Sequence, residues 1–133
     1  MYQGELAGEI FTKLGQTDYA AEIAQIRASG ADSVFFFLPG GMGISFLKQY
    51  ADSGVALPVV GPAFSFDQGI LQAVGDAALG VINTSQWNKD IDNVTNAAFV
   101  KTFQAEYGRL PSLYASQDFD TDNLLLSAME TAH

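Results

Sequence analysis

The sequence has no cysteine, a single histidine at its last position, and only six lysine and arginine residues. Without cysteine the chain cannot form disulfides, thiol nucleophiles or cysteine-based metal sites, although this does not fix its compartment. Fifteen acidic residues give a net charge of -9, which repels phosphate backbones, so we expect no nucleic-acid partner. No apolar run approaches the roughly 18 to 20 residues of a membrane span, and residues 1–8 lack the features of a signal peptide.

The chemistry of catalysis is also missing. No Gly-x-Ser-x-Gly elbow, metal-ligand cluster or convergent acid, base and nucleophile set is present. The glycines at Gly40–Gly43 lack the Gly-Lys-Ser/Thr ending of a phosphate loop. We therefore expect no enzyme activity, no cofactor and no metal.

What is present indicates one folded domain with a repeated local order. The chain has 133 residues, of which 48% are hydrophobic and 16% charged, so it can bury a core. The apolar run Ser33–Leu38 is followed by the turn residues Pro39–Gly43 and the amphipathic stretch Ile44–Ser53. A strand that is apolar on both sides is typical of a parallel sheet covered by helices.

The same order predicts an α/β fold, with an open parallel sheet of about four strands flanked by helices on both faces. The expected strands are Leu6–Phe11, Ser33–Leu38, Pro58–Gly61 and Val81–Thr84. Three successive strand–helix–strand links of this length require parallel pairing. After Thr84 the pattern changes to two helices without a strand between them, the second from Ser112 to about Ala132.

Seven short segments carry a family resemblance. They are Leu14–Tyr19, Ile26–Phe35, Leu47–Gly54, Pro58–Gly61, Gly75–Val81, Phe99–Gly108 and Pro111–Ala115. Their succession resembles the solute-binding proteins of branched-chain amino acid ABC transporters, the periplasmic leucine/isoleucine/valine-binding family. The resemblance implies two α/β lobes that close on a small ligand like a clamshell, a periplasmic location and a membrane permease as partner. A ligand-sensing lobe of a receptor or regulator with the same fold is the alternative.

By this resemblance, residues 1–110 form the second lobe of the clamshell, and residues 111–133 form a helix that packs on a missing first lobe. We therefore expect this chain to be a fragment. The apolar side of its last helix would have lost its partner, which predicts self-association. A single lobe cannot exclude water from its ligand, so binding should be weak or absent.

Ligands of open α/β sheets bind at the carboxyl ends of the strands, and the loops that match the family site lie there. The expected ligand contacts are Pro39, Gly40, Gly41, Met42, Ala63, Phe64 and Trp87. For Phe64 and Trp87, simple packing under a loop is an equal alternative. Family members that bind free amino acids carry an acidic residue in the loop corresponding to Gly61–Phe64, which is apolar here. An unpaired ammonium would be costly to bury. We therefore expect a small ligand that is amino-acid-like, an amide or an aromatic acid. Within this range we favour a carboxylic acid, an amide or an aromatic compound over a free aliphatic amino acid.

Overall fold

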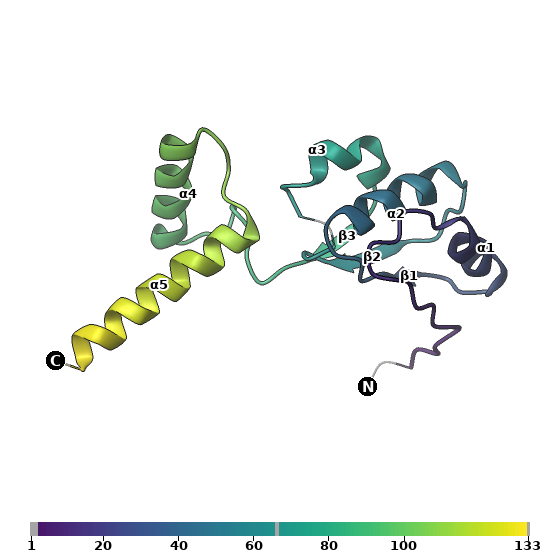
Figure 1. Ribbon diagram of the computed structural model, residues 1–133, viewed down its shortest axis with the longest axis horizontal. Helices are drawn as coiled ribbons and strands as arrows, with labels where there is room; N and C mark the ends of the chain where they lie inside the picture. Colours follow the sequence, from purple (N-terminus) through teal and green to yellow (C-terminus); the bar gives the residue numbers. More distant parts are fainter. Residues whose placement is uncertain (1–2, 66, 133) are drawn as a thin grey trace. The chain divides into compact units, whose positions relative to one another are not determined.

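The computed structural model describes residues 3–65 and 67–132 of the chain (Figure 1). The chain divides into two compact units, Met1–Thr84 and Ser85–His133. The first unit contains the sheet and the second contains two long helices.

The sheet of the first unit consists of three parallel strands in the order β1-β2-β3. They are β1 (Val34–Phe35), β2 (Val59–Pro62) and β3 (Ile82–Thr84). Their register aligns Phe35 with Val60 and Val60 with Ile82. The α/β fold with an open parallel sheet is therefore confirmed, and three of the four predicted strands are found close to their expected positions.

The predicted strand Leu6–Phe11 is wrong. These residues adopt no regular structure, and the side chains of Leu6 and Phe11 are 74% and 88% exposed. A strand needs a neighbour for its backbone N–H and C=O groups and a surface for its apolar side chains. The described residues provide neither for this segment.

Helices pack on one face of the sheet, as Figure 1 shows for α2 and α3. The helices of this unit are α1 (Ala20–Ala28), α2 (Gly41–Asp52), α3 (Leu71–Val74) and the short 3-10 helix η1 (Gly75–Ala78). Their buried side chains form one core with the inward side of β1 and β2. Phe36 belongs to this core, with its ring centroid 5.3 Å from that of Phe46, so the prediction that Phe36 is a core residue is confirmed.

Among the described residues of this unit, no helix covers the opposite face of the sheet, so the prediction of helices on both faces is wrong for this part of the chain. Successive side chains of a strand point to opposite faces, and the register therefore places Phe35, Val60 and Ile82 on the face opposite Phe36. Phe35 and Ile82 are 69% and 55% exposed. A parallel sheet is usually buried on both faces, and this one presents an apolar surface to solvent.

The second unit consists of α4 (Val94–Tyr107) and α5 (Leu113–Thr131), preceded by a polar loop. Asn93 caps α4 by accepting from the N–H of Asn96, and Ser112 caps α5 by accepting from the N–H of Ala115. Gly108 ends α4 with a φ of 65°, a left-handed conformation that glycine adopts without steric cost. The predicted helix from Ser112 to about Ala132 is thus confirmed.

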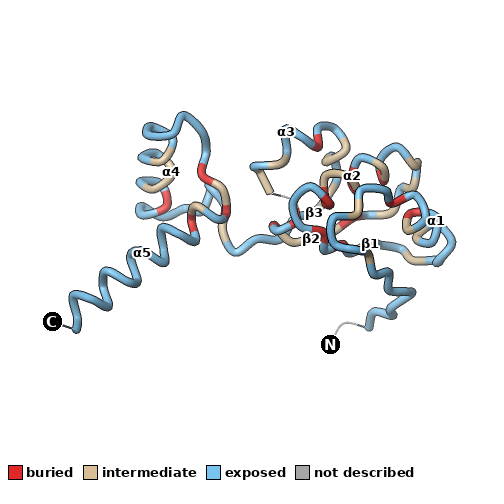
Figure 2. The backbone as a smooth tube through the Cα atoms, in the orientation of Figure 1, coloured by how far each residue is buried: buried red, intermediate tan, exposed pale blue. Residues whose placement is uncertain are grey.

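Most of α5 is exposed along its length (Figure 2). Its apolar side chains Leu124, Leu125, Leu126 and Met129 are all more than half exposed. No helix among the described residues is both long and apolar enough to cross a membrane.

Candidate functional site

The structure brings the two predicted loops together at the carboxyl ends of β1 and β2. The N–H of Gly40, in the loop after β1, donates to the carbonyl oxygen of Phe64, in the loop after β2, at 3.3 Å. Pro39, Gly40 and Gly41 are exposed, and Phe64 is partly so. These four predicted positions therefore lie close together on a surface that a ligand can reach.

Two other predicted positions, Met42 in the first turn of α2 and Ala63 directly after β2, have buried side chains. Met42 is buried, and its sulfur accepts from the N–H of Gly15 at 3.3 Å. Ala63 is 5% exposed, and its N–H donates to the carbonyl oxygen of Thr84 at 2.9 Å, which extends the pairing of β2 with β3. Both side chains therefore pack inside the first unit, and their contact with a ligand stays a prediction.

Phe37 is a neighbour of this surface that the sequence analysis did not select. Its ring centroid lies 6.4 Å from that of Phe64, and its side chain is more than half exposed. Successive side chains of an extended strand point to opposite faces of the sheet, so Phe37 points away from the core that buries Phe36. Because Phe35–Phe37 reads as one apolar run, only the observed burial of Phe36 distinguishes the exposed rings from the core ring.

Ser65 is a second residue that the sequence analysis missed. In the ladder between β1 and β2, the N–H of Phe36 donates to the carbonyl oxygen of Val60 at 3.0 Å. The next rung of this parallel ladder would join Leu38 to Pro62. Instead, the carbonyl oxygen of Pro62 accepts from the N–H of Ser65 at 2.9 Å. The N–H of Leu38 donates to the Ser65 hydroxyl oxygen at 2.8 Å.

The first turn of α2 packs directly on this serine. A Cβ atom added to Gly43 would lie 2.2 Å from the carbonyl oxygen of Ser65 and 2.8 Å from that of Leu38. Only glycine allows an approach this close. Gly41, two residues earlier, has no atom within 4 Å of the corresponding position, so the requirement is specific to Gly43.

The electrostatic character of the surface comes from the backbone. Residues 33–47 and 53–65 include no charged side chain. No side chain caps α2, and the N-cap residue Gly40 has a φ of 57°. The free N–H groups and dipole of a helix N-terminus favour negative charge. Among the described residues, no cluster of His, Cys, Asp or Glu could hold a metal ion.

Trp87, the remaining predicted position, lies in the second unit. Its indole N–H donates to the side-chain oxygen of Asn96 at 2.7 Å, and its ring centroid lies 6.0 Å from that of Phe99. The amide nitrogen of Asn96 in turn donates to the carbonyl oxygens of Lys89 and Ile91. Trp87 therefore has a packing role inside its own unit, and a ligand contact there stays a prediction.

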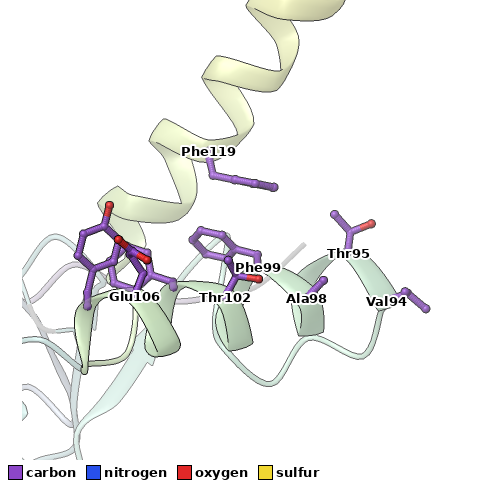
Figure 3. A pocket seen from close by; sticks show the side chains of 9 residues that line it. Val94, Thr95, Ala98, Phe99, Thr102, Glu106 and Phe119 are labelled. Atoms are coloured by element: carbon purple, nitrogen blue, oxygen red, sulfur yellow. The ribbon is translucent and has the colours of Figure 1, made fainter.

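The second unit also contains an open groove of about 760 Å³ along α4 (Figure 3). Phe99 and Phe119 stack beside it with ring centroids 4.7 Å apart. Its lining is otherwise Val94, Thr95, Ala98, Thr102, Phe103, Glu106 and Tyr107. Glu106 is its single charged residue, so this groove does not share the uncharged character of the loop surface.

Comparison with known proteins identifies the chain. The periplasmic binding protein family matches residues 2–133. The chain belongs to this family. A Leu/Ile/Val-binding protein homologue from Brucella melitensis is 31% identical to this periplasmic binding protein over 109 residues, which are 79% of the chain and 28% of the homologue. The resemblance seen in the sequence is thereby confirmed.

Two solved structures extend the comparison. A solute-binding protein of an R. palustris ABC transporter, in complex with benzoate, is 33% identical, with a TM-score of 0.86 over 92% of this chain and 34% of that one. Another, from Rhodopseudomonas palustris BisB5 in complex with 3,4-dihydroxybenzoic acid, is 30% identical, with a TM-score of 0.73 over 86% of this chain and 32% of that one. The periplasmic binding protein described here thus spans about a third of the length of these relatives.

Proposed function

We propose that this chain forms one wall of the ligand cleft in the solute-binding component of an ABC importer. The observation that carries the proposal is the hydrogen bond between Gly40 and Phe64, which holds two exposed loops together at the carboxyl ends of β1 and β2. Open α/β sheets bind their ligands at this edge. Membership of the periplasmic binding protein family supports the same location.

We propose a small aromatic carboxylate as the ligand. The exposed rings of Phe37 and Phe64 offer an apolar surface for an aromatic ring. The uncapped N-terminus of α2 offers partial positive charge for a carboxylate. The absence of acidic side chains from these loops disfavours an ammonium group, as in a free amino acid. Two relatives that were crystallised with benzoate and 3,4-dihydroxybenzoic acid support this class.

In this proposal the chain binds and does not catalyse. It acts in the periplasm and delivers its ligand to a membrane permease. Residues 1–110 belong to one lobe of the clamshell, and residues 111–133 form a helix that packs on the other lobe. Both parts of this assignment follow the family resemblance.

We also propose that the chain self-associates. The bare face of the sheet, with Phe35 and Ile82, and the exposed leucines of α5 present apolar surface in both units. The strand residues on the bare face carry no charge, so two such faces can meet without bringing together the acidic residues that give the chain its net charge. Sedimentation velocity over a range of concentrations tests this, and a monomer throughout would refute it.

The ligand proposal is tested by NMR titration of the chain with benzoate. A single wall should bind weakly, with half-saturation on the order of millimolar, because most of the ligand surface stays in water. Shifts of the backbone amide signals should concentrate at Gly40, Gly41 and Phe64. Benzylamine has the same ring and the opposite charge, so it should cause much smaller shifts at these positions.

Two variants make the test specific. Phe64→Ala should weaken benzoate binding several-fold, because it removes one of the two exposed rings that would contact the aromatic ligand. Phe11→Ala is the matched control, since Phe11 is exposed and lies in an irregular segment outside the site. Equal shifts from benzoate and benzylamine, or equal losses in both variants, would contradict the proposed ligand class.

A further inference from the structure

We infer that Ser65 is a positioning residue of the ligand-binding wall. Its hydroxyl ties the loop after β1 to the loop after β2, and so sets the spacing between the N-terminus of α2 and the ring of Phe64. The inference rests on the function proposed above. Ser65 is fully buried, so it acts through the loops and not by touching the ligand.

The hydrogen-bond ladder explains why a hydroxyl is needed at this place. Regular pairing of β1 with β2 stops after the bond from Phe36 to Val60. If the ladder continued to Pro62, strands β1 and β2 would stay at the usual strand spacing of about 4.8 Å. The Ser65 side chain takes the place of that rung, so the strand ends can diverge into two loops while Leu38 keeps a partner.

The distances indicate which tie between the loops is the stronger one. The bond from Leu38 to the Ser65 hydroxyl is 2.8 Å long and buried. The bond from Gly40 to Phe64 is 3.3 Å long, beyond the usual range for an N–H donor. Ser65 also bears on Gly43 through its backbone, so a shift of Ser65 would move the first turn of α2 as well. Both sides of the site therefore depend on this serine.

Replacing the serine by alanine leaves the N–H of Leu38 buried without an acceptor. The loop then responds by moving or by admitting water, because a buried unpaired donor is costly. Ser65→Thr keeps the hydroxyl and should preserve the tie. Ser116→Ala is a matched control: Ser116 is also a buried serine, but its hydroxyl donates to Leu113 inside the second unit.

The first measurement is amide hydrogen exchange of the whole chain, followed by NMR. Ser65→Ala should speed exchange at Leu38 by about tenfold, since the lost bond leaves local opening easier. Exchange at Phe36, which donates to Val60, should not change. Ser65→Thr should restore the wild-type rate at Leu38, and Ser116→Ala should leave it untouched.

The second measurement is the benzoate titration in the same variants. Ser65→Ala should need a several-fold higher benzoate concentration to shift the amide signals of Gly40 and Gly41 to half-saturation. Ser116→Ala should match the wild type, and Ser65→Thr should recover its value. A role limited to general stability would change neither this concentration nor the pattern of shifts.

The outcomes test the positioning role of Ser65 separately from the proposed ligand class. Unchanged exchange at Leu38, or an equal rise at Leu38 and Phe36, overturns the inference whatever the ligand does. A local rise at Leu38 with unchanged benzoate affinity also overturns it, because the tie would then not matter for binding. If the wild-type chain shows no benzoate shifts at all, the proposed ligand fails, and the tie itself is then judged by the exchange rates.

Discussion

Phe36 and Gly61 should be coupled, because the ring of one occupies the place where a side chain of the other would lie. A Cβ atom added to Gly61 would be 2.5 Å from Cε1 of Phe36 and 2.9 Å from its Cδ1 and Cζ. Gly61 lies in β2 and has no positive φ, so alanine meets no backbone strain there. The perturbation is a double-mutant cycle of Gly61→Ala with Phe36→Leu.

The expected magnitudes follow from packing. Gly61→Ala alone should lower the free energy of unfolding by about 1–2 kcal/mol, because overpacking outweighs the gain from a stiffer unfolded chain. Phe36→Leu alone should cost about 1–2 kcal/mol, while Phe36→Ala should cost about 3–5 kcal/mol. In the leucine background most of the obstructing ring is gone. Gly61→Ala should then be neutral to within about 0.5 kcal/mol.

The assay is urea unfolding followed by circular dichroism, combined with amide exchange of β2. Fluorescence is unsuitable, because the single tryptophan, Trp87, lies in the second unit and reports on that unit. Gly41→Ala is the control, since no atom lies within 4 Å of its added methyl group. It should be neutral or slightly stabilising, as expected for alanine in place of glycine in a helix.

The double-mutant cycle can refute the proposed contact between Phe36 and Gly61. Additive effects, with a coupling energy below about 0.5 kcal/mol, would mean that Phe36 and Gly61 do not share space in solution. A Gly61→Ala protein as stable as wild type would lead to the same conclusion. Either result would remove the stated reason for glycine at this position of β2.

Three further predictions concern other parts of the chain. Gly43→Ala should lower the thermal midpoint markedly, because its methyl group would meet a backbone carbonyl oxygen at 2.2 Å, and a stable variant would contradict this packing. Asn96→Ala should destabilise the second unit by about 2–4 kcal/mol and shift the emission of Trp87 to the red, since several polar groups lose their partner, and unchanged fluorescence would refute the role of Asn96. Burial raises the pKa of Tyr19 and Tyr50 above the ordinary value of 10.0, so the folded state holds these protons more tightly than the unfolded state. Their contribution to stability should be intact below about pH 10 and lost as the pH rises through the folded pKa values, and unfolding that does not become easier at alkaline pH would exclude it.

The structure separates what local patterns can predict from what they cannot. The strands near Ser33–Leu38 and Pro58–Gly61 were predictable, because an apolar run bounded by turn residues is a local property. The segment Leu6–Phe11 has a similar local pattern but remains irregular and exposed. The wrong strand prediction for this segment shows that strand formation also depends on a neighbouring strand to pair with. A local sequence pattern does not reveal whether such a neighbour exists.

The candidate site divides in the same way. Its location was predictable, because the carboxyl ends of parallel strands follow from the order of strands and helices. The inward orientation of Met42 and Ala63 was not, since it depends on contacts with Gly15 and Thr84. Ser65 is an ordinary polar loop residue in the sequence, and its partner Leu38 lies 27 positions away.

The α/β class, the parallel sheet and the loops of the candidate wall were thus predictable from local sequence patterns. These follow from hydrophobic periodicity and from the conformations open to proline and glycine, which act within a few residues. The exposed face of the sheet and the Ser65 hydroxyl that joins the two loops became visible only in the folded chain. Strand register and hydrogen bonds between distant residues set these features, and both arise only when the chain folds back on itself.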